Sequence, residues 1–299
     1  MKEAVLSVKR MIIILMILLL SLLVSLSVFT EANGEWILTQ YDAGGSVGMF
    51  YSLVNQANGM LILIDGGWTS NAEQVKSVIE ANGGAVNYWI LTHYHEDHCG
   101  AFNALWPEYK EKIENVYVTP LTWNDFEPYC REWDTPETFK LFLEQTKDAK
   151  NIVPLHRGDK LDIDSLDINI YNAWDDIILL HSTDVANNCS LVFRIQYGNT
   201  SVLFLGDMVA EGLADFLLET YGADILHADY IQAGHHGWGR YPMSFYQTLN
   251  PKEIFLDATD DLLTSEEYKN AHGILVRWCQ ENGIPMHSFK TAPYNVTLK

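Results

Sequence analysis

Cysteine is scarce in this chain and occurs in no recognisable motif. Only four cysteines are present among 299 residues, at positions 99, 130, 189 and 279, and no two of them form a Cys-x-x-Cys pair. One or two disulfides are possible if the chain is exported, but the count alone does not assign them. Cys99 and Cys189 lie beside polar motifs, and we expect both to be small buried residues and not metal ligands.

Positive charge is also scarce. Nineteen Lys and Arg residues stand against 39 Asp and Glu residues, which gives a formal charge of -20 and an isoelectric point near 4.7. Proteins that bind nucleic acids tightly and without sequence preference neutralise phosphates with Lys and Arg, so this composition argues against such binding. A nuclease is not excluded, because a local groove can differ in charge from the whole surface.

Linkers, repeats and low-complexity tracts are absent as well. After the first 32 residues no stretch rich in Pro, Gly and Ser divides the chain, and no phosphate-binding Gly-x-x-x-x-Gly-Lys loop occurs. Aromatic and aliphatic residues are spread throughout the rest, which is long enough to bury a substantial core. We therefore expect a single folded domain over residues 33–299.

The first 32 residues have the composition of a targeting segment. Basic residues within the first ten precede a run from Met11 to Phe29 that carries no charge. A basic region followed by a long apolar one is typical of a secretory signal peptide or an uncleaved membrane anchor. Both interpretations place the rest of the chain outside the cytoplasm, either secreted or held at the membrane. The sequence at residues 30–32 fits a cleavage site only loosely, so both stay open.

The most informative stretch follows an apolar strand at residues 88–91 and reads His-Tyr-His-Glu-Asp-His. Side chains alternate along an extended segment, so His93 and His95 point the same way and can bind one cation. Asp97 and His98 follow where the strand turns into a loop or helix. They can reach a second cation, about 3.5–4 Å from the first as in two-metal hydrolases. The spacing therefore predicts two neighbouring metal sites.

Three more apolar strands end in polar side chains that suit metal ions. Loops at strand ends are where rigid scaffolds place chemistry. Each motif is weak or moderate evidence by itself, but in this order with the histidine cluster they indicate a metal site. The motifs are Asp65-Gly66-Gly67 after residues 60–64, Gly206-Asp207 after residues 201–205, and Gly234-His235-His236-Gly237 after residues 228–233.

The order His-x-His-x-Asp-His, then Gly-Asp, then a late histidine resembles the metallo-β-lactamase superfamily of hydrolases. Within it, residues 187–192, 197–201 and 234–237 resemble the branch related to the hydrolase domain of DNA-uptake competence proteins. The resemblance runs from about residue 37 to residue 299. It implies an α/β fold, a four-layer αββα sandwich, with the metal ions at one edge of its two sheets.

The resemblance also implies a set of metal ligands, with Asp207 bridging two ions. Either residue of the His-His pair could be the late ligand. We favour His235 because it is the first to leave the strand, and His236 would then lie behind the ligands. The expected terminal ligands are His93 and His95 for one ion, and Asp97, His98 and His235 for the other.

Other residues are expected beside the ligands. Asp65 resembles a carboxylate that fixes the tautomer and orientation of a ligating imidazole. Many superfamily members carry another histidine where this chain has Asn187, Asn188 and Ser190, and we expect Asn188 to lie near the ligands. The first metal would then keep an open position for water or substrate. His272 resembles a histidine before the last helix of relatives, and it could protonate a leaving group or be an ordinary surface residue.

The expected cofactor is a pair of zinc ions, although manganese or iron also suits carboxylates and an open position. Two divalent cations lower the pKa of bound water from about 15.7 toward about 7, so a metal-bridged hydroxide would be the nucleophile. Asp97 and Asp207 would orient that hydroxide. We expect an exported binuclear hydrolase that acts on phosphodiesters or other phosphoesters, either small molecules or components of the cell envelope.

Two alternatives to phosphoester hydrolysis stay open. The first is hydrolysis of amide, lactone or other ester bonds, and the second is a metal-binding recognition module without catalysis. Trp238, Arg240 and Tyr241 follow the late histidines and are expected to overhang the metals. There a cation beside two aromatic rings could bind a phosphate, or the rings could cage a quaternary ammonium group.

The segment after the histidine cluster is expected to form part of the rim. It contains a predicted helix over residues 136–145, with Thr135 as its cap. Three aromatic residues precede this helix, Trp123, Tyr129 and Trp133. We expect them to pack in the core, and a substrate groove is the alternative.

Overall fold

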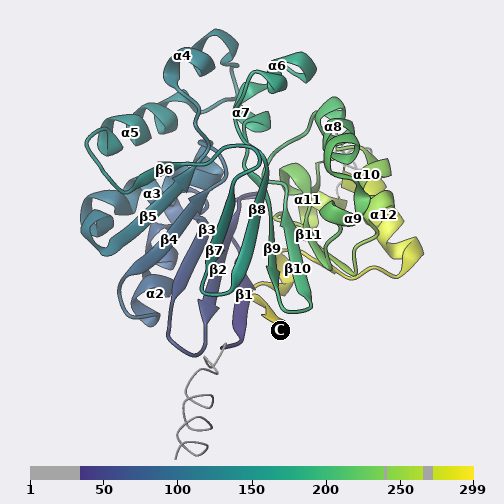
Figure 1. Ribbon diagram of the computed structural model, residues 1–299, viewed down its shortest axis with the longest axis horizontal. Helices are drawn as coiled ribbons and strands as arrows, with labels where there is room; N and C mark the ends of the chain where they lie inside the picture. The colour runs from purple at the N-terminus through teal and green to yellow at the C-terminus, as the bar shows by residue number, and fades with distance from the viewer. Residues whose placement is uncertain (1–33, 239–240, 265–271) are drawn as a thin grey trace, which may run out of the picture. The chain divides into compact units, whose positions relative to one another are not determined.

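Two seven-stranded β-sheets form the centre of the fold (Figure 1). In the first sheet, four neighbouring strands run parallel to one another and the remaining pairs are antiparallel. From edge to edge its strands are β14 (Tyr294–Leu298), β1 (Trp36–Gln40), β2 (Phe50–Asn55), β3 (Leu61–Asp65), β4 (Val86–Leu91), β5 (Ile113–Val118) and β6 (Ile152–Pro154).

The second sheet has the same mixed character. Four of its strands are parallel neighbours, and the other three pair in antiparallel fashion. From edge to edge its strands are β13 (Met286–His287), β12 (Glu253–Phe255), β11 (Tyr230–Gln232), β10 (Thr200–Phe204), β9 (Val192–Tyr197), β8 (Leu166–Asn172) and β7 (Lys160–Ile163).

Each sheet buries both of its faces. In β3, Leu63 packs toward the helices while Ile62 and Ile64 pack into the core between the sheets. Tyr51 and Phe204 join the two sheets across that core, with ring centroids 5.2 Å apart in an edge-on arrangement. Strands covered on both faces need apolar side chains at nearly every position, which explains the continuous apolar runs in the sequence.

Helices cover the outer face of each sheet (Figure 1). The first sheet carries α2 (Ala72–Ala81), α3 (Glu96–Tyr109) and α5 (Pro136–Thr146), and the second carries α8 (Glu211–Tyr221), α10 (Met243–Leu249) and α12 (His272–Asn282). The other helices are short, namely α4 (Trp123–Phe126), α6 (Ile177–His181), α7 (Val185–Asn188), α9 (Ala223–Leu226) and α11 (Asp260–Thr264). Two mixed sheets flanked by helices confirm the predicted α/β sandwich.

The computed structural model describes residues 34–238, 241–264 and 272–299, and these elements belong to one compact unit, Glu35–Lys299. The predicted targeting segment, residues 1–32, lies outside the described residues. Within the described part of the chain no helix has the length and apolar character that crossing a membrane requires. The four cysteines are unpaired, so neither of the disulfides considered from the sequence forms. As expected, Cys99 and Cys189 are buried.

The predicted helix before the second sheet is observed as α5, with Phe139 and Phe142 buried on one face. Thr135 occupies the N-cap position, but its hydroxyl makes no capping hydrogen bond to α5. The Thr135 hydroxyl instead accepts a hydrogen bond of 3.0 Å from the backbone N–H of Glu96. The start of α5 is therefore tied to the start of α3, where the histidine motif lies.

Candidate metal centre

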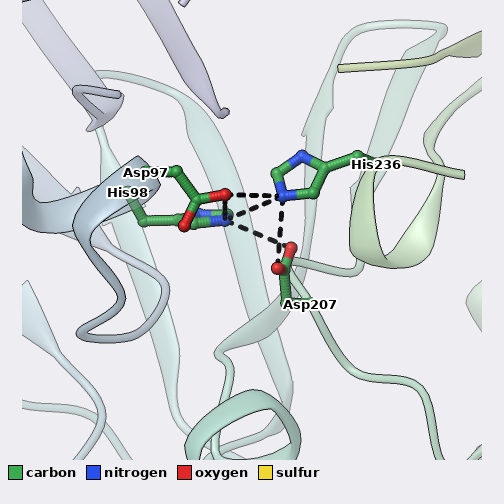
Figure 2. Close-up of side chains that lie close together, drawn as sticks. All are labelled: Asp97, His98, Asp207 and His236. Atoms are coloured by element: carbon green, nitrogen blue, oxygen red, sulfur yellow. Dashed lines mark hydrogen bonds and ion pairs between the residues drawn. The ribbon is translucent and has the colours of Figure 1, made fainter. Parts of the chain in front are cut away.

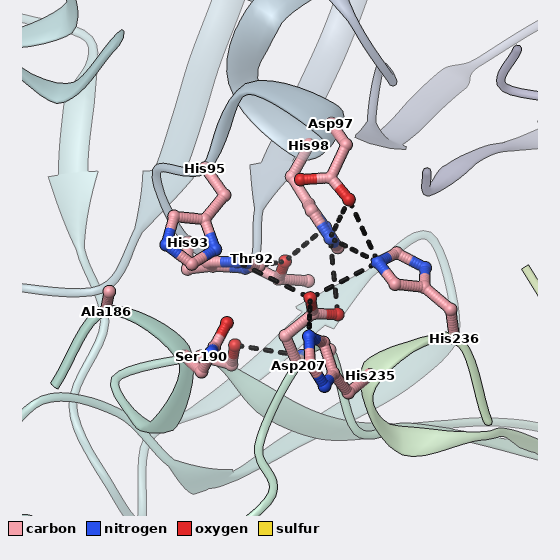
Figure 3. A network of polar contacts seen from close by, with 12 residues as sticks. Thr92, His93, His95, Asp97, His98, Ala186, Ser190, Asp207, His235 and His236 are labelled. Atoms are coloured by element: carbon pink, nitrogen blue, oxygen red, sulfur yellow. Dashed lines mark hydrogen bonds and ion pairs between the residues drawn. The ribbon is translucent and has the colours of Figure 1, made fainter. Parts of the chain in front are cut away.

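The polar motifs meet because their strands end at the same edge of the two sheets. β3 and β4 are parallel neighbours in one sheet, and β10 and β11 are parallel neighbours in the other. The carboxyl ends of parallel strands lie on one side of a sheet, where clefts form. The polar side chains of the histidine motif, Asp207 and the two late histidines therefore gather in one place, although more than 100 residues separate the first from the last in the sequence (Figure 3). Those of the motif are Thr92, His93, His95, Asp97 and His98.

The gathered side chains form two groups of potential ligand atoms, each within 4.8 Å of one another. Asp207 belongs to both groups, as a bridging carboxylate would. In the larger group (Figure 2), His236 Nε2 lies 3.0 Å from Asp97 Oδ2 and 3.2 Å from Asp207 Oδ2. The groups are His93, His95 and Asp207, and Asp97, His98, Asp207 and His236.

The late histidine of the larger group is His236 and not His235, contrary to the preference from the sequence. His235 Nε2 lies 3.7 Å from Asp207 Oδ2, and the side chain is 28% exposed, whereas that of His236 is 3% exposed. Being the first to leave the strand was a poor guide because the backbone turns sharply at this point. His235 instead lines the pocket over the centre.

Backbone strain accompanies this arrangement. His235 and His236 have φ values of 50° and 57°, in the left-handed region that residues with a Cβ rarely occupy. Asp65, at the end of β3, has a φ of 51°. Each such residue costs about 1–3 kcal/mol, and such strain is concentrated at functional sites. Three strained residues lie around the candidate metal centre. The strain lowers the stability of the fold, and it accompanies the positioning of these side chains.

Asp65 lies directly behind His98 and sets its orientation. An oxygen of Asp65 is 2.7 Å from His98 Nδ1, and the other accepts a 2.7 Å hydrogen bond from the backbone N–H of Thr92. The hydroxyl of Thr92 also donates to Asp65 at 2.7 Å. With Nδ1 held by a carboxylate, His98 presents Nε2 to the other side chains of the larger group. These contacts match the role that the resemblance implied for Asp65.

Asp134 has the same relation to His95, and the sequence analysis missed it. Its Oδ1 lies 3.3 Å from His95 Nε2, and its Oδ2 accepts a 2.7 Å hydrogen bond from the backbone N–H of Arg131. The Asp134 side chain is only 1% exposed. This contact leaves Nδ1 of His95 as its ligand atom. No sequence motif marks Asp134. Its neighbours Trp133 and Thr135 were predicted to be a core aromatic residue and a helix cap.

Burial and opposite charges set the pKa values at the centre. Burial lowers the pKa of His236, but Asp207 and Asp97 outweigh burial and raise it to about 10. Burial raises the pKa of Asp207, yet the imidazoles of His236 and His98 hold it well below its usual range. The pKa of His93 is lowered well below its usual value, first by burial and then by His98. Metal ions bind neutral imidazoles, so cations here would take the place of protons.

The residues fit a pair of divalent cations. His93 Nε2 is buried and has no hydrogen-bond partner among the described residues. Unpaired buried polar atoms are costly unless an ion or water satisfies them. Imidazole nitrogens with carboxylate oxygens suit zinc, manganese and iron alike. The first group has only two imidazoles and the shared carboxylate, so a metal ion bound there would have room for a further ligand.

Asn188 has a structural role and does not touch the ligand groups. It is fully buried, and its Oδ1 accepts hydrogen bonds from the backbone N–H groups of Val209 and Ala210 at 3.0 and 2.9 Å. Asn188 therefore acts behind the ligand groups, where it fixes the loop that follows Asp207. Ser190 contacts that loop directly, because its hydroxyl accepts a 3.0 Å hydrogen bond from the backbone N–H of Asp207.

A pocket of about 410 Å³ lies over the two groups. Trp238 lines it, as predicted from the sequence, and so does Trp133, for which core packing was expected. Trp68 and Val47 also line the pocket and were not identified from the sequence. The lining residues are Val47, Trp68, His95, Glu96, Asp97, Trp133, Thr135, Asp184, Asn187, Asp207, Val209, His235, His236 and Trp238.

The remaining predicted substrate residues differ in outcome. Tyr241 is only 3% exposed and packs against Phe245 and Tyr246, so it supports the histidine loop from below and does not overhang the metals. Arg240 lies outside the described residues. His272 begins α12, and its side chain is outside what the structure describes.

Comparisons with known proteins agree with this geometry. The family model of the metallo-β-lactamase superfamily matches residues 50–250. No curated protein matches the sequence. CmlA, a diiron β-hydroxylase from Streptomyces venezuelae, is similar in structure with a TM-score of 0.55 and 13% identity over 89% of this chain and 54% of that chain. The chain thus spans about half the length of CmlA, and this likeness concerns the fold alone.

A second solved structure is YhfI from Bacillus subtilis, a metallo-β-lactamase fold protein with a TM-score of 0.48 and 12% identity, covering 88% of this chain and 99% of that chain. The family match covers two thirds of the sequence, including every residue of the two ligand groups. The chain belongs to the metallo-β-lactamase superfamily.

Proposed function

We propose that this protein is an exported metal-dependent hydrolase of phosphodiesters or other phosphoesters. The observation that carries the proposal is the pair of ligand groups that share Asp207 at the floor of a pocket. A site closed on all sides by protein would suit a structural metal, whereas an open position beneath a pocket of this size suits a reacting substrate.

Some of these residues would bind the cations, and others would position the reacting groups. The two histidines of the first group and the larger group that includes His236 would hold the ions, with Asp207 shared. When bound, the ions supply Lewis-acid activation of water and of the phosphoryl oxygen. Asp97 lines the pocket with its carboxylate 14% exposed, so it can orient the attacking water. Asp207 is nearly buried and acts chiefly by position.

Other parts of the proposal rest on the sequence. The resemblance of residues 187–192, 197–201 and 234–237 to the hydrolase domain of DNA-uptake competence proteins supports a phosphodiester as substrate, because DNA is a phosphodiester. The charge of -20 supports a small or cell-envelope phosphoester over a long polynucleotide. The basic and apolar first 32 residues support export, with the domain secreted or anchored at the membrane. Zinc is the favoured metal, with manganese or iron as alternatives.

A panel of chromogenic substrates tests the proposal on the full chain. We expect turnover of bis(p-nitrophenyl) phosphate at a higher kcat/KM than p-nitrophenyl acetate or a simple lactone. Asp97→Asn removes a carboxylate from the larger ligand group and should lower kcat for the diester by about 100-fold or more. Asp224→Asn is the matched control because Asp224 is exposed on α9, outside the pocket. Faster turnover of the acetate or the lactone than of the diester would move the assignment to carboxylic esters.

A further inference from the structure

Three tryptophans wall the pocket over the ligand groups, each from a different part of the chain. Trp68 follows β3, Trp133 precedes α5 and Trp238 follows the histidine pair. The Trp68 ring is held in place because its Nε1 donates a 2.6 Å hydrogen bond to the carbonyl of Val47. Trp133 is 65% exposed, so its ring is accessible to a ligand in the pocket.

The polar groups in this wall are hydrogen-bond acceptors. Glu96 lines the pocket, and no hydrogen bond or ion pair from the described part of the chain reaches its carboxylate. Asn187 is 3% exposed, and its Oδ1 has no partner among the described residues. Its Nδ2 donates to Asp184 Oδ2 at 3.2 Å, so the amide orientation is fixed and the oxygen is left to accept. Such an atom needs a donor, which a water molecule or a ligand can supply.

The charges of the residues that line the pocket also favour a ligand that donates hydrogen bonds or carries positive charge. Among the described lining residues none is Lys or Arg, while Glu96 adds a negative charge beyond the metal ligands. Arg131, just outside the lining, is paired with Asp184 at 3.2 Å and lies 5.5 Å from the Trp133 ring centroid. We call the part of the pocket lined by Glu96 and the three tryptophans the outer pocket. An anionic substrate group there would face a carboxylate, whereas a cation would meet a carboxylate and aromatic rings.

We propose that the outer pocket binds a positively charged, ammonium-type group of the substrate while the scissile bond lies at the ligand groups. The inference rests on the proposed function for the reaction, and it adds the substrate class: phosphoesters that carry an ammonium group on one arm. Tryptophan faces attract such a group through cation–π interaction, and Glu96 supplies the opposite charge.

Two chromogenic diesters with the same leaving group test this inference. We expect p-nitrophenyl phosphorylcholine to have a kcat/KM about tenfold above that of p-nitrophenyl ethyl phosphate, which lacks the ammonium group. Glu96→Gln and Trp133→Ala should each reduce that ratio by about threefold or more. Neither change should prevent folding, because the Glu96 carboxylate is unpaired within the described residues and the Trp133 ring is largely exposed. Glu73→Gln on α2 is the control and should leave the ratio unchanged.

Binding of tetramethylammonium separates this inference from the proposed reaction. Saturation-transfer NMR on the metal-loaded protein should show its methyl signal, and Glu96→Gln and Trp133→Ala should weaken it. If neither diester is cleaved, the phosphoester proposal fails, and the tetramethylammonium result alone decides the inference. Equal kcat/KM for the two diesters overturns the inference, and so does tetramethylammonium binding that is absent or that survives both substitutions.

Discussion

His95 Nε2 and Asp134 Oδ1 lie 3.3 Å apart although 39 residues separate them in the sequence. Both carboxylate oxygens of Asp134 are engaged, since the second accepts from the backbone N–H of Arg131. A buried carboxylate therefore connects a side chain of the first ligand group to the segment that carries Trp133. The same segment reaches α3 again through Thr135. The ligand groups and the pocket wall are thus one connected structure.

This contact predicts the effect of Asp134→Asn. An amide offers only one oxygen, so it cannot accept from both His95 and Arg131, and one contact is lost. We expect metal affinity to fall by about 10- to 100-fold, the range typical for residues that orient a ligating histidine. Competition with a coloured chelator measures the metal affinity. The visible absorption spectrum of the cobalt-substituted protein should also shift. Asp148→Asn, an exposed acid elsewhere, serves as control. Unchanged affinity in a folded Asp134→Asn protein would contradict this role.

The two late histidines should behave differently when each is replaced. His236→Ala removes a nitrogen that lies 3.0 Å from Asp97 and 3.2 Å from Asp207, so we expect the loss of about one equivalent of bound metal. His235→Ala should keep the full metal content, because its nitrogen lies outside the larger group. Elemental analysis after gel filtration gives both numbers. The opposite pattern would restore the original preference for His235 as ligand.

Asn188→Ala should destabilise the fold without changing a ligand. Its amide makes contacts at both ends, accepting from the loop after Asp207 and donating 2.8 Å to the carbonyl of Asp184. Each lost bond costs about 0.5–1.5 kcal/mol and leaves buried groups unpaired, so we expect a loss of about 3 kcal/mol. Urea denaturation measures it. Asn199→Ala, at an exposed asparagine, should change stability by less than about 0.5 kcal/mol.

The stability should depend on pH through Asp229, which precedes β11. Burial raises the pKa of this carboxyl, but hydrogen bonds from Lys252 and Ser201 outweigh burial and lower it below 3.8. A carboxyl with a lowered pKa stabilises the fold above pH 3.8, and this contribution is lost as the pH falls below that value. Asp229→Asn should therefore be less stable than the wild type at pH 7, and the gap should narrow toward pH 3.

Urea denaturation of both proteins between pH 7 and pH 3 checks this expectation. Asp162→Asn, at an exposed acid on β7, is the control whose gap from the wild type should stay small throughout. A gap for Asp229→Asn that is constant across the pH range would show that the carboxylate charge contributes nothing to the fold.

Local patterns in the sequence predicted the strand ends and most of the centre. Alternation along a strand placed His93 and His95 in one group, and apolar runs ending in Asp65 and Asp207 marked the edge where strands meet. These features depend on a few neighbouring residues, so the sequence contains them. The two mixed sheets followed from the family resemblance and not from periodicity.

The errors concern features that depend on tertiary structure. Two successive left-handed residues place His236 in the larger group instead of His235, and no residue pattern announces such strain. Asp134 meets His95 only because the chain returns after 39 residues. Tyr241 follows the histidine pair in the sequence, yet it packs beneath that loop. Proximity in sequence was therefore a poor guide to which side of the loop a residue occupies.

The most direct test of the account is the metal content of the purified full chain, measured together with hydrolysis of bis(p-nitrophenyl) phosphate before and after treatment with a chelator. We predict about two equivalents of divalent metal per chain, loss of hydrolysis when the chelator removes them, and recovery when zinc or manganese is restored. A protein that binds no metal, or that cleaves the diester equally well after the metal is removed, would contradict the assignment of a binuclear hydrolase.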